Sequence, residues 1–230
     1  MALSVGMCST SLPRAHFSVV IDPGHGGRDA GAPASIPGRY EKEVALAISK
    51  ALASRLTGQK NVSVTLTRGD DRFLSLRERR RIITSCKPKL VVSVHADSGP
   101  PRARGASVYV LNEVGEAIVV GRLAGPAKSG RYGDDLAYLL AHLEQRASVN
   151  FAASLAADIH QSLSASDTYV RRPKTANFAL LKSAGIPSIL VETGYLSDND
   201  DAIRLLGPAG QADIADAIAA PILKVARRHR

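Results

Sequence analysis

The stretch Phe17-Ser18-Val19-Val20-Ile21-Asp22-Pro23-Gly24-His25-Gly26-Gly27 is an apolar run that stops in a turn rich in glycine and proline. A β-branched run bounded by proline and glycine predicts a buried strand followed by a sharp turn. The turn carries His25, which we therefore place at the carboxyl edge of a sheet. Ligands bind at that edge in open α/β sheets, so His25 is a candidate metal ligand or base.

Two further candidate side chains follow short apolar runs in the same way. The run Leu90-Val91-Val92-Ser93-Val94 precedes His95, and the run Ser188-Ile189-Leu190-Val191 precedes Glu192. If these strands are parallel, the side chains of His25, His95 and Glu192 emerge at the same edge of the sheet. The sequence therefore predicts that two imidazoles and a carboxylate converge there.

Helical patterns alternate with these runs. Apolar residues at four-residue spacing follow Tyr40-Glu41-Lys42-Glu43 and predict a helix, and Ser75 to Glu78 fits a capping box that opens another one. Charge runs usually form solvated faces, which is how we interpret the arginines of this second helix, Arg77, Arg79, Arg80 and Arg81. Further strands are predicted at 62–67, 106–111 and 176–181. The alternation favours a single α/β domain with a largely parallel sheet.

One segment, at about 112–146, breaks this alternation. Residues 112–134 are rich in glycine, charged and small residues without a clear period, which indicates an insertion or a mobile loop. A short helix is predicted from Leu136 to Leu143, and its apolar face needs a partner. A longer amphipathic helix is predicted from Val149 to Leu163.

Composition limits the class of protein. The 230 residues are 45% hydrophobic, which suits one sizeable core, and the net charge of +9 favours anionic partners such as cell-wall polymers. The absence of tryptophan and the 4% aromatic content argue against nucleic acid. No run reaches the roughly 18 apolar residues of a transmembrane helix. Cys8 and Cys86 can pair or stay free, so the cysteines do not indicate a compartment.

The first residues lack the features of an export signal. Residues 1–15 have neither a basic start nor a long apolar run, so no convincing signal peptide is present. We expect a disordered or leader-like tail over 1–15 and a catalytic domain over 16–230.

The candidate residues suit metal-dependent hydrolysis. Two imidazoles and one carboxylate form a ligand set for Zn²⁺ that leaves a position for water. Glu41 can supply the carboxylate while Glu192 acts as the base, but the opposite assignment fits the spacing equally well. Acidic residues are also common in the first turn of a helix, so Glu41 and Glu43 have a purely structural interpretation as well.

At this point the sequence resembles a known family, the zinc-dependent N-acetylmuramoyl-L-alanine amidases of bacterial cell-wall hydrolysis. The resemblance rests on five blocks in order: 20–27, Glu41-Lys42, Thr67-Arg68 with 74–77, 93–97 and 186–197. It implies a mixed six-stranded sheet flanked by helices, with the zinc site at the carboxyl edge of the strands. It also implies that His25, Glu41 and His95 hold one zinc ion per chain and that Glu192 is catalytic.

The resemblance implies an activity as well. It predicts hydrolysis of the amide bond between N-acetylmuramic acid and L-alanine of peptidoglycan, with a zinc-bound water as nucleophile, in the periplasm or outside the cell. Residues 105–145 are similar to the insertion of division-associated members, in which a helix covers the zinc until an activator protein moves it. We therefore expect low resting activity and an activator that acts on about 112–146.

Two other functions remain open at this stage. One is a cell-wall-binding or regulatory module that keeps the fold without turnover. The other is a zinc peptidase or deacetylase, which needs the same ligands. The intact set of His25, Glu41, His95 and Glu192 argues against the module.

Overall fold

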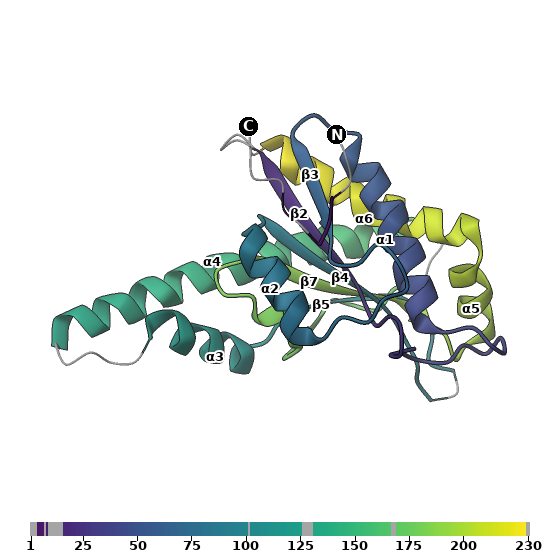
Figure 1. Cartoon of the computed structure of the whole chain (residues 1–230), viewed down its shortest axis with the longest axis horizontal. Helices are drawn as coiled ribbons and strands as arrows, with labels where there is room; N and C mark the ends of the chain where they lie inside the picture. Colours follow the sequence, from purple (N-terminus) through teal and green to yellow (C-terminus); the bar gives the residue numbers. More distant parts are fainter. Residues whose placement is uncertain are drawn as a thin grey trace.

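The computed structural model describes residues 4–6, 8, 16–100, 102–125, 131–166 and 169–228 (Figure 1). Its strands are β1 Ser4–Val5, β2 Phe17–Pro23, β3 Val62–Leu66, β4 Leu90–Asp97, β5 Ser107–Leu111, β6 Lys174–Ala176 and β7 Ser188–Tyr195. Its helices are α1 Glu41–Thr57, α2 Leu76–Cys86, α3 Glu113–Ala124, α4 Arg131–Ser164, α5 Asn199–Leu206 and α6 Pro208–Arg228, with a 3₁₀ turn η1 at Leu180–Lys182.

The strands form one mixed sheet in the order β1-β3-β2-β4-β7-β5-β6. The pairs β1–β3, β3–β2, β2–β4 and β4–β7 are parallel. Strand β5 runs antiparallel to β7 and parallel to β6. The predicted α/β domain with a mixed sheet is confirmed. The sheet has seven strands instead of the expected six because the two-residue β1 is added at its edge.

The alternation of side chains along the strands sorts the core onto two faces of the sheet. Ile21 and Val92 share the largest hydrophobic cluster with residues of α1, α4, α5 and α6. Val20, Val91 and Leu190 point the other way and pack in smaller clusters with residues of α2, α3 and η1. Each central strand is therefore covered on both faces, as expected for parallel strands.

The start of α2 follows the predicted capping box. The backbone N–H of Glu78 donates to the Ser75 side chain, and the Glu78 carboxylate accepts from the backbone N–H of Ser75. This exchange satisfies donors that the first turn of a helix leaves free. The capping box thereby fixes the residue at which α2 begins.

The N-terminal segment differs from the expected disordered or leader-like tail at each of its described residues. Ser4 and Val5 pair with Thr65 and Leu66 of β3. Cys8 forms a disulfide with Cys86 at the end of α2. Both contacts link positions far apart in the chain, so local sequence patterns do not predict them.

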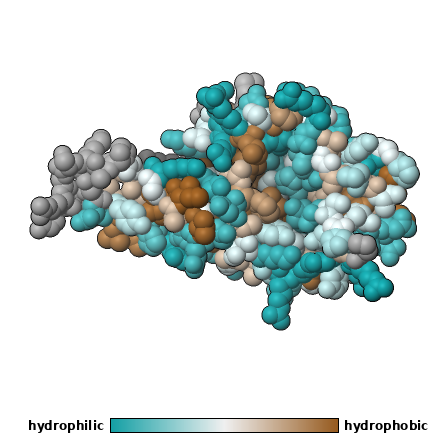
Figure 2. Space-filling model, turned by 90° about the horizontal axis from the view of Figure 1, so that it is seen from below, coloured by the Kyte–Doolittle hydropathy of each residue, from teal (hydrophilic) through white to brown (hydrophobic). Residues whose placement is uncertain are grey.

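The segment expected to be an insertion or loop forms a helical hairpin that projects from the main body (Figure 1). The Asn112 side chain caps α3 by accepting from the backbone N–H of Gly115. The prediction of an irregular segment over 112–134 is therefore wrong for 113–124, which form this helix. The two helices predicted after it are one continuous helix, α4. An ion pair between Glu116 and Arg146 joins α3 to α4. Figure 2 shows hydrophobic residues in brown on this projection.

The predicted strand at 176–181 is also wrong in position. The strand is β6, at 174–176, and Leu180 and Leu181 lie in η1 instead. Both leucines are buried in the small clusters on the α2 face of the sheet. A helical turn directs two consecutive apolar side chains toward one face, which an extended strand does not.

Candidate metal centre and its pocket

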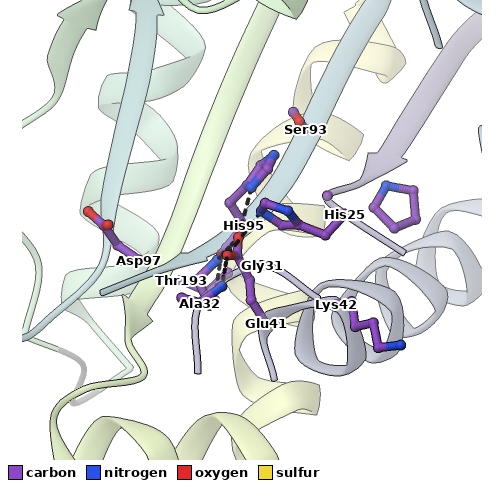
Figure 3. A network of polar contacts seen from close by, with 12 residues as sticks. His25, Gly31, Ala32, Glu41, Lys42, Ser93, His95, Asp97 and Thr193 are labelled. Carbon is purple, nitrogen blue, oxygen red and sulfur yellow. Dashed lines mark hydrogen bonds and ion pairs between the residues drawn. The ribbon is translucent and has the colours of Figure 1, made fainter. Parts of the chain in front are cut away.

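Glu41 lies between two imidazoles at the carboxyl edge of the sheet (Figure 3). Its Oε2 atom is 3.0 Å from Nε2 of His25, and its Oε1 atom is 2.8 Å from Nδ1 of His95. One ligand atom from each of the three residues lies within 4.8 Å of the others. Two ring nitrogens and a carboxylate oxygen are a donor set that zinc takes in proteins. The structure therefore brings together the three residues that we expected to be ligands.

Two glycines make this close approach possible. A Cβ atom on Gly24 would lie 2.4 Å from the ring of His95. A Cβ atom on Gly31 would lie 2.6 Å from Oε2 of Glu41 and 2.7 Å from Cδ2 of His25. His25 itself has a φ of 56°, a left-handed conformation that residues with a side chain rarely adopt. The turn after β2 is thus shaped around the three candidate ligands.

Asp29 is a site residue that the sequence analysis missed. Its Oδ1 atom is 2.9 Å from Nδ1 of His25, on the side of the ring that faces away from Glu41. This bond favours the tautomer with hydrogen on Nδ1, so the lone pair that a metal would take lies on Nε2, the atom that faces Glu41. The four-residue spacing from His25 in a glycine-rich loop is the only sequence feature that points to Asp29.

The three central groups influence each other's protonation. Burial disfavours the charged form of His25, but the hydrogen bond and charge of Glu41 outweigh it and raise the imidazole's pKa. The same balance raises the pKa of His95. Burial would raise the pKa of Glu41, yet its hydrogen bonds to the two imidazoles lower that pKa. A metal ion entering the cluster therefore competes with protons on the imidazoles.

Glu192 lies on the strand next to His95, as its direct neighbour in the register of β7 and β4. Both residues lie within strands that are longer than expected, because β4 continues to Asp97 and β7 continues to Tyr195. A register shift follows this pair, which ends the regular pairing beside the site. Glu192 is not one of the three clustered residues.

The Glu192 carboxylate is poised to hold a proton near neutral pH. Burial is the main cause that raises its pKa to about 7, and the negative charges of Asp97 and Glu41 act in the same direction. Its Oε2 atom is buried and has no hydrogen-bond partner within the described part of the chain. An unpaired carboxylate oxygen of this kind is available to a water or substrate in the pocket.

A pocket of about 660 Å³ contains both the cluster and Glu192. It opens on the α2 face of the sheet, where Ser93, His95 and Glu192 alternate with core residues. The rest of the lining mixes apolar side chains with polar ones, which include Ser75 and Arg79 beside α2 and the carboxylates of Asp22, Asp29 and Asp97. Its apolar members are Ala32, Phe73, Leu74, Leu76, Phe178, Ala179, Leu180 and Leu190.

None of the described residues of 112–146 lines this pocket. In this structure the helix that contains Leu136 to Leu143 therefore does not cover the candidate metal site with any described residue. The physical reason is the continuity of α4, which packs against α3 and extends away from the main body (Figure 1).

Comparison with known proteins identifies the family. The sequence profile of the N-acetylmuramoyl-L-alanine amidases matches residues 19–224, which include all four candidate residues. The chain belongs to the N-acetylmuramoyl-L-alanine amidase family. The resemblance that the five sequence blocks indicated is thereby confirmed, and so is the fold that the amidase family implied.

Individual amidases show the same relationship. The chain is 34% identical to AmiA of Escherichia coli over 218 residues, which cover 89% of this chain and 74% of AmiA. It is 31% identical to AmiC of Escherichia coli over 218 residues, again 89% of this chain, but it spans only 51% of AmiC. The structure of amidase AmiC2 of Nostoc punctiforme superposes with a TM-score of 0.71 at 31% identity, covering 92% of this chain and 98% of that one.

Proposed function

We propose that this chain hydrolyses the amide bond between N-acetylmuramic acid and L-alanine in peptidoglycan, with one zinc ion bound by His25, Glu41 and His95. The observation that carries the proposal is the pocket that holds this cluster together with the buried, unpaired carboxylate of Glu192. The names of the related amidases AmiA and AmiC support the choice of substrate. The donor set also fits zinc, because Asp29 binds Nδ1 of His25 and thereby turns Nε2 toward Glu41, inside the cluster.

When bound, zinc would lower the pKa of a coordinated water to about 7 and polarise the amide carbonyl. Glu192 takes a proton from the attacking water at Oε2 and passes it to the amide nitrogen as the bond between carbon and nitrogen breaks. Hydrolysis leaves a carboxylate on the lactyl group and a free amine on L-alanine. A pKa of about 7 suits both halves of this transfer, because Glu192 can accept and release the proton near neutral pH.

The pocket walls suit a neutral, partly apolar substrate around the scissile amide. Phe73 and Phe178 line the pocket, and 37% and 40% of their surface is exposed. We assign these rings to contact with the lactyl methyl group and the faces of the sugar. The basic character of the whole chain, with a net charge of +9, complements the carboxylates of the cell-wall polymer.

We also propose that an activator protein binds the hairpin of α3 and α4. Leu136, Leu140 and Leu143 are each more than half exposed on α4, and Val114 is 62% exposed on α3. Exposed apolar groups concentrated on one projection are typical of a protein interaction site. The role of such a partner is not to lift the helix off the pocket, because the described hairpin does not cover it.

The location of action follows from the substrate, so we propose export to the periplasm or the outside of the cell. The disulfide between Cys8 and Cys86 supports this, because disulfides persist mainly in oxidising compartments. Among the described residues, no helix has the length and apolar content to cross a membrane.

The test is incubation of the zinc-loaded protein with purified peptidoglycan, followed by identification of the new chemical groups. The proposal predicts new free amines on L-alanine and free lactyl carboxylates on muramic acid. New amines on the sugars would instead indicate a deacetylase, and other new peptide ends would indicate a peptidase. Binding without any product would indicate a wall-binding module. Glu192→Gln, which keeps the shape of the side chain, serves as the matched control.

A further inference from the structure

Two buried arginines lie beneath the turn that carries His25. Arg68 has 0% and Arg79 has 3% of its surface exposed. The interpretation of Arg79 as part of a solvated face is wrong, because its Nη1 atom forms a 2.8 Å ion pair with the buried Asp22. Burying a guanidinium group is costly unless its donors are satisfied, so the contacts of these two side chains need an explanation.

Their donors converge on three successive carbonyl groups of the turn. The Pro23 carbonyl accepts from Arg68 Nε at 3.1 Å and from Arg79 Nη1 at 2.6 Å. The Gly24 carbonyl accepts from Arg68 Nη2, and the His25 carbonyl accepts from Arg79 Nη2, each at 2.5 Å. These bonds hold the backbone at the position where His25 adopts its left-handed conformation. That conformation is unfavourable in a residue with a side chain, so it needs such support.

Each arginine also binds a second segment of the site. Arg68 Nη2 donates to the Lys42 carbonyl at 3.0 Å, next to the candidate ligand Glu41. Arg79 Nε donates to the Leu74 carbonyl at 3.1 Å, in the apolar wall of the pocket. Arg68 therefore joins the turn of His25 to the first turn of α1, which carries Glu41. Arg79 joins the same turn to the wall before α2.

The arginine side chain suits this task better than lysine does. Its planar fork presents five donors in fixed directions, whereas the lysine ammonium presents three donors from one atom. The hydrogen bonds of Arg68 all go to carbonyl oxygens, namely those of Pro23, Gly24, Lys42 and Asp70. Burial and the nearby charge of Arg79 lower the pKa of Arg68 to about 10. Burying the Arg68 guanidinium is unfavourable, so its presence here indicates that the side chain fixes the geometry of the backbone around it.

We propose that Arg68 and Arg79 are positioning residues that hold His25 relative to Glu41 and thereby set the affinity of the site for zinc. This inference rests on the proposed metal centre. It differs from a general contribution to folding, because it predicts loss of metal affinity that loss of stability alone does not produce.

The test compares Arg68→Lys and Arg79→Lys with the control Thr67→Val. Thr67 Oγ1 donates to Asp22 Oδ1 at 2.6 Å, so the control weakens the same buried network without touching a carbonyl of the turn. The zinc dissociation constant is measured by competition with a chelating dye, and the visible spectrum of the Co²⁺ form reports the ligand geometry. Urea unfolding of the metal-free proteins gives their stability.

We expect each lysine variant to weaken zinc binding roughly 10–100-fold, the usual effect of losing a group that orients a metal ligand. We expect an altered Co²⁺ spectrum in the lysine variants, and wild-type affinity and spectrum in Thr67→Val despite its lower stability. If Arg68→Lys does not fold, Arg79→Lys decides the question.

Wild-type zinc affinity in a folded lysine variant would overturn the inference, and so would equal weakening in the control. A wild-type protein that retains no zinc would overturn it together with the metal centre. A wild-type protein that binds zinc but releases no L-alanine amine would remove only the proposed function, because the inference concerns binding.

Discussion

Replacing Gly31 by alanine tests whether the geometry of the three clustered residues determines metal affinity. The new Cβ atom would lie 2.6 Å from Oε2 of Glu41 and 2.7 Å from Cδ2 of His25, whereas ordinary contacts begin at 3.4 Å. One or both candidate ligands must therefore move by roughly 0.5 Å or more, which is about the tolerance of a preorganised site. We expect the zinc dissociation constant to rise at least about tenfold, equivalent to about 1.4 kcal/mol of binding free energy.

The control is Gly38→Ala in the same loop. Gly31 has a φ of +68° and Gly38 has a φ of +76°, so both variants carry the same left-handed strain of about 1–2 kcal/mol. No atom lies within 4 Å of a Cβ on Gly38, so this variant lacks the contact with the site. Chelator competition gives the zinc affinity of both variants, and urea unfolding without metal gives their stability. Equal zinc affinity in the two variants would refute the reasoning.

Three further results are expected. Glu192→Gln should retain zinc but lower turnover roughly 100-fold, the scale of losing a positioned base, as measured by metal analysis and product release; loss of zinc would mean that Glu192 is a ligand. Zinc affinity should rise with pH, because the raised pKa values of His25 and His95 keep both rings protonated at pH values above 6.5, the ordinary imidazole pKa, and protons compete with the metal. Isothermal titration at several pH values checks this, and an affinity that does not change with pH would contradict it. Removing the disulfide by Cys8→Ser with Cys86→Ser should destabilise the protein by up to about 4.5 kcal/mol, the chain-entropy estimate for a separation of 78 residues, as measured by urea unfolding. Unchanged stability would show that the bond does not constrain the unfolded chain.

The sequence by itself predicted the alternating strands and helices and the convergence of His25, His95 and Glu192. These features depend on short-range patterns: apolar runs of strand length, four-residue spacing on a helix, and glycine-rich turns that end a strand. Parallel strands direct their carboxyl ends to the same edge, so the pattern also predicted where the site lies. The capping box at Ser75 was readable for the same reason, since its partners are three residues apart.

The tertiary structure decided the features that depend on contacts between distant residues. Spacing left Glu41 and Glu192 interchangeable, and the family resemblance favoured Glu41 as the ligand. The folded chain places Glu41 between the two imidazoles. The charge run that contains Arg79 predicts a solvated face, yet the Arg79 side chain is buried, and so is that of Arg68.

Local sequence patterns also did not predict the hairpin of α3 and α4 or the disulfide between Cys8 and Cys86. The hairpin depends on packing between two helices, and the disulfide joins residues 78 positions apart. The sequence therefore determined which chemical groups are present and at which edge of the sheet they gather. Long-range contacts determined which of those groups meet, because neither burial nor distance between remote side chains is encoded in local periodicity.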